Sequence, residues 1–236
     1  MGKNLIQQRR GRGTKTYTSP GFRFKGAVKH YPIETSGTVV DLVHCAGHSA
    51  PLMTVSYLTG DYGLSFAPEG IKVGDTVTLG GANDGQLRAG DVLTLAQIPE
   101  GTLIHNIELR PGDGGKLVRT SGVFAKVVAK TNTEVRVLLP SRKEKIFSLQ
   151  CKAAIGSVSG SGRIEKPFLK AGTRFFRMKA RNKLYPRVCG ISMNAVDHPF
   201  GGKCSHIKGR PTQSPRNAPP GRKVGKIAPR RTGRRR

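Results

Sequence analysis

The chain has 236 residues, enough for two small domains or for one larger domain with extensions. Its 41 Lys and Arg against 14 Asp and Glu give a formal net charge of +27, and self-repulsion of that size predicts a polyanionic partner, nucleic acid first and an anionic membrane surface second. No apolar run approaches the roughly 18 residues of a membrane span, which excludes an integral membrane protein.

The charge is distributed unevenly along the chain. Residues 1–33 carry eight Lys or Arg and no acid, whereas residues 34–100 carry eight acids and two bases. Residues 101–197 hold 19 bases and six acids, and residues 198–236 hold 12 bases and no acid. Two basic arms therefore flank a body whose first half is mildly acidic, and the arms are expected to bind phosphate.

The first predicted segment is the basic N-terminal arm, residues 1–33. Its Arg-rich, acid-free composition is typical of transit peptides, but Gly11, Gly13 and Pro20 would break the amphipathic helix that such a peptide needs. We therefore expect the arm in the mature chain. The predicted RNA contacts in it are Arg9, Arg10 and Arg12.

The body that follows is predicted to be all-β. Short stretches rich in β-branched residues are separated by Gly, Pro and Asp turn signals, a pattern that favours small barrels over an α/β sheet. Pro99-Glu100-Gly101 makes a plausible seam, with one domain over residues 34–100 and a second over 101–172. The expected strands cover residues 38–43, 52–58, 76–79, 92–96, 123–129, 134–139, 145–148 and 153–157.

The last predicted segment is a basic C-terminal extension over residues 173–236. A short helix is possible at Lys170–Lys183. No other segment shows a sustained helical pattern of apolar residues, and this argues against a helix-turn-helix or a coiled coil. After His198 the chain has six Pro, six Gly and one aromatic residue, so it cannot bury enough apolar surface to fold alone. We expect this tail to become ordered on a partner, with predicted RNA contacts from Arg222, Lys223, Arg230 and Arg231.

A glycine-rich stretch, HNIELRPGDGGKLVRTSG, occupies residues 105–122. One interpretation is a loop that binds phosphate with its backbone N–H groups, framed by Arg110, Lys116 and Arg119. The other is an ordinary Gly-rich hairpin turn, and spacing alone does not separate the two. The Gly-Lys-Ser/Thr ending of a Walker A loop is absent.

A second glycine cluster, residues 156–163, precedes a run in which bases alternate with Phe168, Phe175, Phe176 and Tyr185. Such rings suit stacking on bases or riboses, although Phe175 or Phe176 is expected to pack onto the second barrel instead. The RNA contacts predicted here are Arg163, Lys166, Arg174, Lys179 and Arg181.

The segment GISMNAVDHPFGG, residues 190–202, places Asn194, Asp197 and His198 in one loop. An Asp beside a His invites an acid–base interpretation, but adjacent residues rarely form the Asp–His hydrogen bond of a triad, and no activated nucleophile is evident. We favour Asn194 and His198 as contacts to a phosphate or a base edge.

Neither a metal site nor a cofactor is predicted. His44, Cys45 and His48 lie close together, and Cys189, Cys204 and His206 could add ligands. The spacing fits no zinc finger or ribbon, however, and free thiols in a reducing cytosol are the default.

Four stretches together resemble the universal large-subunit ribosomal protein family L-two. They are residues 105–122, GRIEKPFLKAG (162–172), PRVCGISMNAVDHPFGG (186–202) and the tail GRKVGKIAPRRTGR (221–234). The resemblance runs through essentially the whole chain, and its Met-Asn-x-Val-Asp-His-Pro element is specific. The short N-terminal arm and the His-Pro-Phe-Gly-Gly variant resemble the archaeal and eukaryotic branch, and the compact chain favours archaea.

This resemblance implies an OB-like barrel followed by an SH3-like barrel, in a cytoplasmic ribosomal protein with ribosomal-protein neighbours and no homo-oligomer. It implies binding to large-subunit rRNA, a role in joining the subunits, and a loop near the peptidyl transferase centre. His198 matches a family histidine once proposed as catalytic, and the resemblance implies support of an RNA active site. One departure is His44-Cys45-Ala46-Gly47-His48, where relatives are closer to His-Asp-Pro-x-Arg, which puts that arginine's rRNA contact in doubt.

Two alternatives remain open from the sequence. One is a free RNA-binding assembly or translation factor that exchanges on and off the particle. The other is a hydrolase or transferase that uses Asp197 and His198, which would need a pocket and a nucleophile.

Overall fold

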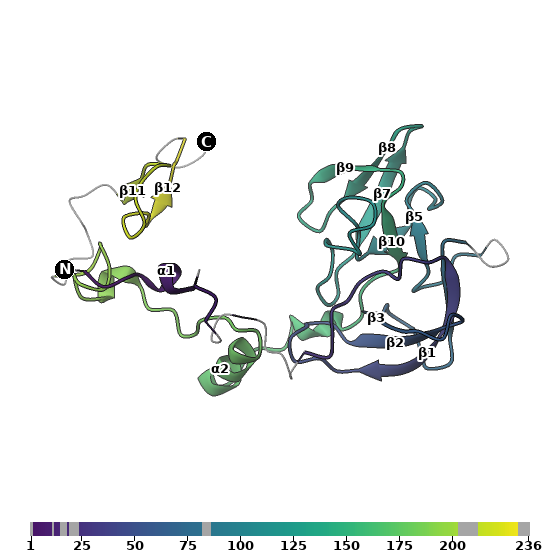
Figure 1. Ribbon diagram of the computed structural model, residues 1–236, viewed down its shortest axis with the longest axis horizontal. Helices are drawn as coiled ribbons and strands as arrows, with labels where there is room; N and C mark the ends of the chain where they lie inside the picture. The colour runs from purple at the N-terminus through teal and green to yellow at the C-terminus, as the bar shows by residue number, and fades with distance from the viewer. Residues whose placement is uncertain are drawn as a thin grey trace. The chain divides into compact units, whose positions relative to one another are not determined.

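The computed structural model describes residues 2–10, 12–14, 18, 24–81, 86–202 and 212–230. The chain forms two compact units (Figure 1). The end unit joins Met1–Pro20 to Arg174–Arg236, and the sheet unit comprises Gly21–Thr173. Helix α2 (Ala171–Ala180) crosses the division and matches the short helix expected from the sequence.

The sheet unit is built on one ten-stranded sheet, in the order β3-β2-β1-β4-β5-β10-β6-β7-β8-β9. Its neighbouring strands pair antiparallel except β4 and β5, which are parallel. The all-β prediction is therefore confirmed, while the OB-like and SH3-like barrels stay predictions. The strands are β1 (Thr35–Val43), β2 (Leu52–Tyr57), β3 (Tyr62–Phe66), β4 (Thr76–Leu79), β5 (Val92–Thr94), β6 (Leu103–His105), β7 (Ala125–Lys130), β8 (Glu134–Leu138), β9 (Glu144–Ser148) and β10 (Lys152–Ile155).

Alternation along the strands determines which side chains enter the core. In β8, Val135 and Val137 are buried while their neighbours are exposed, because successive strand side chains point to opposite faces. In β1 a bulge between Val39 and Asp41 interrupts this alternation, and Val40 and Asp41 are both exposed.

The buried residues of the sheet unit form three clusters. One joins Val39, Val55 and Val77 of β1, β2 and β4. A larger cluster packs Leu93 and Ile98 with residues of β6–β10, because β10 pairs with both β5 and β6. Residues just before the predicted domain boundary at 99–101 thus pack in the same core as strands that follow it. The division of the chain into four segments remains a prediction. The third cluster comprises Val28, Cys45, Ala50, Leu52, Phe66 and Val158.

The end unit contains α1 (Ile6–Arg10), a 3-10 turn (Gly190–Ser192) and a parallel pair of two-residue strands, β11 (Gln213–Ser214) and β12 (Lys226–Ile227). Within its described residues, the buried apolar side chains are those of Leu5, Ala180 and Ala218. This core is very small, so packing within the chain contributes little to the stability of the unit. Throughout the described ranges, the helices are too short or too polar to cross a membrane.

Candidate nucleic-acid interface

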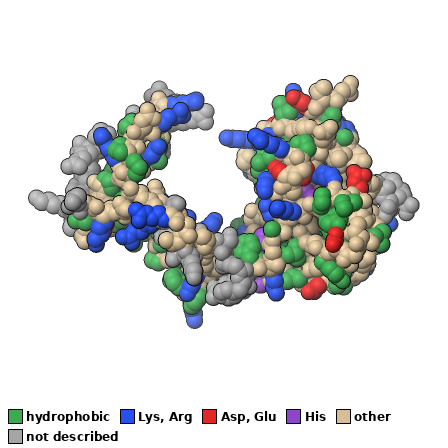
Figure 2. All heavy atoms as spheres, in the orientation of Figure 1, with side chains coloured by type: hydrophobic (Ala, Val, Ile, Leu, Met, Phe, Trp, Pro, Cys, Tyr) green, Lys and Arg blue, Asp and Glu red, His purple; other side chains and the backbone are tan. Residues whose placement is uncertain are grey.

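Positive charge is concentrated in the end unit. It carries 23 Lys or Arg against one acid, a net charge of +22, whereas the sheet unit carries 18 against 13, a net charge of +5. On the face drawn in Figure 2, the acidic side chains that can be seen belong to the sheet unit. The two chain ends therefore form the most cationic part of the molecule.

The N-terminal arm binds directly to the 190–202 loop. The backbone N–H of Lys3 donates to the carbonyl oxygen of Val196 at 2.9 Å, and the Lys3 Nζ lies 3.9 Å from Asp197 Oδ1. Leu5 is buried, and its N–H is capped by Gln8 Oε1 at 2.8 Å. Segments predicted as parts of two separate arms thus lie side by side (Figure 1).

The 190–202 loop is held closed by its own backbone. The carbonyl oxygen of Asn194 accepts the N–H groups of Asp197 and His198, at 3.0 and 3.2 Å. The N–H of Gly202 donates to the Met193 carbonyl oxygen. At Gly201 an added Cβ would lie 2.2 Å from the Asn194 oxygen, so any larger residue would force the loop open. The sequence therefore folds this loop into a defined shape.

His198 is fixed in one orientation by that loop. The backbone N–H of Phe200 donates to His198 Nδ1 at 3.0 Å, so the neutral ring carries its proton on Nε2. Burial lowers the pKa of His198, which favours the neutral ring at physiological pH. Gly190 supports the ring, because a Cβ there would lie 2.4 Å from His198 Cε1.

Asp197 does not orient His198. The Asp197 carboxylate lies near Lys3, while Nδ1 of His198, the atom that an orienting carboxylate would contact, is bonded to Phe200. Within the described residues the pair therefore lacks the geometry of an acid–base dyad. The position of His198 suits hydrogen bonding through Nε2 to a ligand.

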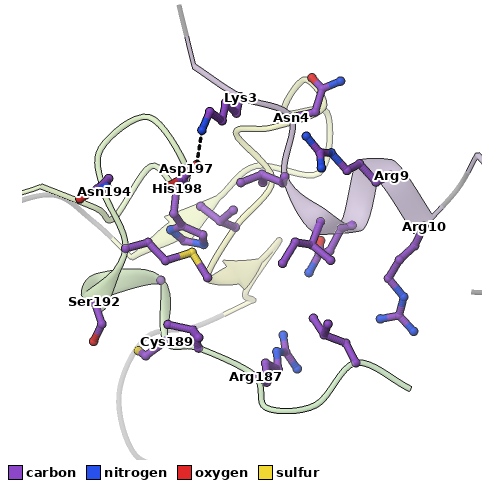
Figure 3. Close-up of a pocket in the computed structure, with 18 of the residues that line it drawn as sticks. Lys3, Asn4, Arg9, Arg10, Arg187, Cys189, Ser192, Asn194, Asp197 and His198 are labelled. Atoms are coloured by element: carbon purple, nitrogen blue, oxygen red, sulfur yellow. Dashed lines mark ion pairs between the residues drawn. The ribbon is translucent and has the colours of Figure 1, made fainter. Parts of the chain in front are cut away.

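A cavity of about 1440 Å³ lies between the N-terminal arm and the segment of residues 183–198 (Figure 3). Lys3, Arg9 and Arg10 line it from the arm, and Arg187, Asn194 and His198 line it from the opposite segment. It combines cationic side chains with hydrogen-bonding groups, a composition suited to a phosphate-bearing ligand.

The glycine-rich loop of the sheet unit already uses its backbone donors. Glu108 is buried and accepts the N–H groups of Gly112 and Gly114, at 3.2 and 2.9 Å, and that of Lys152 at 2.9 Å. Asp113 accepts three more, from Leu109, Arg110 and Gly115, and the N–H groups of Asp113 and Lys116 donate to carbonyl oxygens. Each N–H group from residue 109 to residue 116 is therefore bonded within the protein, which favours the turn interpretation.

The charge state of Asp113 follows from those bonds. Its slight burial opposes ionisation, but the N–H donors of Leu109, Gly115 and Arg110 outweigh it, and the pKa of Asp113 is lowered. The ionised carboxylate occupies the place that a phosphate would take in an anion-binding loop. Exposed Arg110 and Lys116 are left as the groups of this loop that can reach RNA.

Arg119 was predicted beside those two residues, but the structure gives it contacts inside the protein. Its guanidinium donates to the carbonyl oxygens of Gly115 and Val28, at 3.2 and 3.1 Å, and lies 5.2 Å from the centre of the Phe66 ring. It therefore ties the chain before β1 to the glycine-rich loop. Arg163 has a comparable bond, from Nε to Ser121 Oγ at 2.6 Å.

The other predicted RNA contacts lie mostly at the surface. Arg174 lies 5.3 Å from the centre of the Tyr185 ring, and Arg181 is half-buried. Phe175 and Phe176 form an edge-on pair, and both are exposed. The expectation that one of them would pack into a core is therefore wrong. Arg231 lies outside the described residues. The exposed positions are Arg9, Arg10, Arg12, Lys166, Arg174, Lys179, Asn194, Arg222, Lys223 and Arg230.

Lys3, Asn4 and Arg187 line the cavity but were not among the predicted RNA contacts. Their only signal was membership of the basic arms, since their proximity depends on the pairing of the two chain ends. No group of three metal-ligating side chains occurs in the described ranges, and Cys204 and His206 lie outside them.

Comparison with known proteins identifies the family of the chain. The family model described as "Ribosomal Proteins L2, C-terminal domain" matches residues 88–222, more than half of the chain. The chain belongs to the L2 ribosomal protein family. Large ribosomal subunit protein uL2 of Methanothermobacter thermautotrophicus is 47% identical over 243 residues, covering 100% of both chains. The uL2 proteins of Haloarcula marismortui and Methanococcus aeolicus are 47% and 46% identical, covering 99% and 100% of this chain.

The resemblance seen in the sequence is thereby confirmed, and the archaeal relatives agree with the predicted branch of the L2 family. The matched region contains both the glycine-rich loop and the 190–202 loop. The match to the Methanothermobacter thermautotrophicus protein covers the whole chain, and residues 1–87 are therefore included in it.

Proposed function

We propose that this chain is a structural constituent of the large subunit of the cytoplasmic ribosome and binds large-subunit rRNA chiefly through its end unit. The observation that carries the proposal is the combination of a net charge of +22 with three buried apolar side chains in the described part of that unit. The described part of the unit lacks a core large enough to offset its self-repulsion, and in this proposal a polyanion supplies the stabilisation.

The mode of binding follows from the same balance. Lys and Arg contacts to phosphate supply affinity, and the closed 190–202 loop supplies a fixed shape for one RNA surface. The sheet unit contributes Arg110, Lys116 and Lys166, and its acidic part, residues 34–100, faces ribosomal-protein neighbours. Assembly of the end unit is then coupled to its folding on RNA.

The family of the chain also suggests where its parts lie in the ribosome. The 190–202 loop would lie near the peptidyl transferase centre and support its RNA, and the chain would help join the two subunits. His198 acts there as a hydrogen-bond donor rather than as a catalyst. Its Nδ1 is bonded to the Phe200 N–H, and no carboxylate orients it for proton transfer. We therefore propose a binding protein that has no enzymatic activity of its own.

A salt wash of ribosomes tests the proposal against the assembly-factor alternative. A tagged chain should remain in purified large subunits at one copy per particle after a high-salt wash. A factor held only by exchangeable phosphate contacts is released, because each such contact weakens steeply with salt. Substoichiometric recovery, or recovery with free small RNAs, would exclude a structural constituent.

A further inference from the structure

The cavity in the end unit has walls that phosphate contacts do not explain. Ile6, Leu184 and Val188 line it while remaining 39%, 38% and 54% exposed. A surface that bound only phosphates would need no apolar wall, since phosphate contacts use charged and polar groups. The ligand of this cavity must therefore present a flat or apolar face.

Most of the charged side chains that line the same cavity are cationic, which indicates the charge of the ligand. Lys3, Arg9, Arg10, Lys183 and Arg187 line it, and the acid among its lining residues, Asp197, lies 3.9 Å from Lys3. The ligand therefore carries negative charge close to its apolar face.

Polar groups in the cavity suit the edge of a nucleobase. His198 lines it with Nδ1 already bonded to Phe200, which leaves the Nε2–H as a donor. Asn4, Ser192 and Asn194 also line the cavity and carry amide and hydroxyl groups that can donate or accept. A base edge offers both donors and acceptors, so these mixed groups match it better than they match a simple anion.

We propose that this cavity binds an unpaired nucleotide of the RNA, with its base against Val188 and Leu184 and its phosphates against Arg9, Arg10 and Arg187. Paired RNA hides its base faces in the stack, whereas an unpaired nucleotide offers a face, a polar edge and a phosphate together. The volume of about 1440 Å³ exceeds the ~300–1,000 Å³ of small-molecule pockets, so a short single-stranded segment can enter. This inference rests on the proposed RNA-binding function and goes further by naming the form of RNA bound.

Ultraviolet crosslinking of native large subunits, followed by mass spectrometry of the peptides, tests the site in the unaltered chain. Cys189 and Met193 line the cavity and provide reactive positions. The expected result is a nucleotide attached through its base to residues 188–193, mapping to an unpaired rRNA position. RNA adducts at Arg110, Lys166 or Arg222 but none in residues 183–198 would overturn the inference and leave the proposed function standing. A protein crosslink at residues 188–193 in place of a nucleotide would also overturn it.

A matched pair of variants gives the second test. Val188→Asp places a carboxylate in the apolar wall, and Ile227→Asp makes the same change at a similarly exposed position of β12 that does not line the cavity. In particles with Val188→Asp, the crosslinked nucleotide should become several-fold more reactive to a base-modifying reagent, and in those with Ile227→Asp it should not.

If the nucleotide reacts equally in particles with either variant, it does not bind in this cavity. If Val188→Asp fails to enter particles, the adduct on the unaltered chain decides the question. A chain that contacts no rRNA at all would refute the proposed function itself, which keeps the two failures distinguishable.

Discussion

The backbone N–H of Lys3 donates to the carbonyl oxygen of Val196 at 2.9 Å, and this bond joins the N-terminal arm to the loop that carries His198. Leu5, two residues further along, is one of the few buried apolar side chains in the described part of the end unit. The arm and the loop therefore act as one surface, and a change in the arm should alter the loop.

Replacing Leu5 with Asn should loosen the arm without removing any positive charge. Burial of a leucine contributes about 2 kcal/mol, so the amide of Lys3 and those of residues 193–202 should exchange faster with deuterium in purified large subunits that carry the variant. Lys3→Gln is the control, because it keeps the backbone bond and removes only an exposed ion pair of small value. Unchanged exchange in Leu5→Asn would show that the arm does not hold the loop.

Substitutions at Arg119 and Arg110 should have different effects, because Arg119 stabilises the fold and Arg110 is expected to contact RNA. Arg119→Met removes two charged hydrogen bonds to carbonyl oxygens and should lower the free energy of unfolding by about 2–4 kcal/mol. Arg110→Met changes an exposed side chain, so stability should shift by less than about 0.5 kcal/mol while RNA affinity falls. Denaturant unfolding of both variants checks this, and equal stability of the two would contradict the role given to Arg119.

Glu108→Gln should destabilise the glycine-rich loop. The buried carboxylate accepts N–H groups from Gly112, Gly114 and Lys152, and an amide would turn its own donor toward one of them. The expected loss is about 2–3 kcal/mol in the free energy of unfolding. Glu134→Gln, at an exposed position of β8, is the matched control and should be near neutral. A small loss at Glu108 would mean that the loop does not depend on this carboxylate.

Buried histidines should make stability fall in mild acid. Burial lowers the pKa of His105 to about 4, and burial also lowers the pKa of His30. The unfolded chain therefore takes up protons first, so stability is full above about pH 6.5 and decreases toward pH 4. At pH 5 the contribution from His105 is a loss of about 2 kcal/mol relative to pH 7.

Unfolding curves at pH 7 and pH 5 measure that difference. His105→Gln should remove about 2 kcal/mol of the difference and leave the smaller part due to His30 and Asp113, whereas His44→Gln, at an exposed position, should leave the whole difference. A difference in His105→Gln as large as in the unaltered chain would assign the effect to other groups. Asp113, whose pKa is lowered, adds a loss in the same direction as the pH falls through its folded value.

Much of the sheet could be predicted from local sequence, because β1, β2, β4 and β8 are runs of β-branched residues with clear turns. β3 was missed because Gly63 interrupts the pattern, and the reason for that glycine is tertiary, since a Cβ would lie 2.7 Å from the Tyr57 ring. β6, with three residues, owes its existence to pairing with β7 and β10.

The sequence predicted that the candidate site is positively charged, but it did not predict which segments lie together there. Composition indicated that Arg9 and Arg10 bind RNA, but only the backbone bond between Lys3 and Val196 brings the arm to the loop. Spacing grouped Arg119 with the RNA contacts of the glycine-rich loop, but its bonds to the carbonyl oxygens of Gly115 and Val28 depend on the tertiary fold.

Crosslinking of the chain to RNA in cells, with sequencing of the attached RNA and mapping of the peptides, tests the central claim most directly. We predict crosslinks at a few sites of large-subunit rRNA, mostly from residues 1–20 and 174–236. Crosslinks scattered over many RNAs, or concentrated in the acidic residues 34–100, would contradict it.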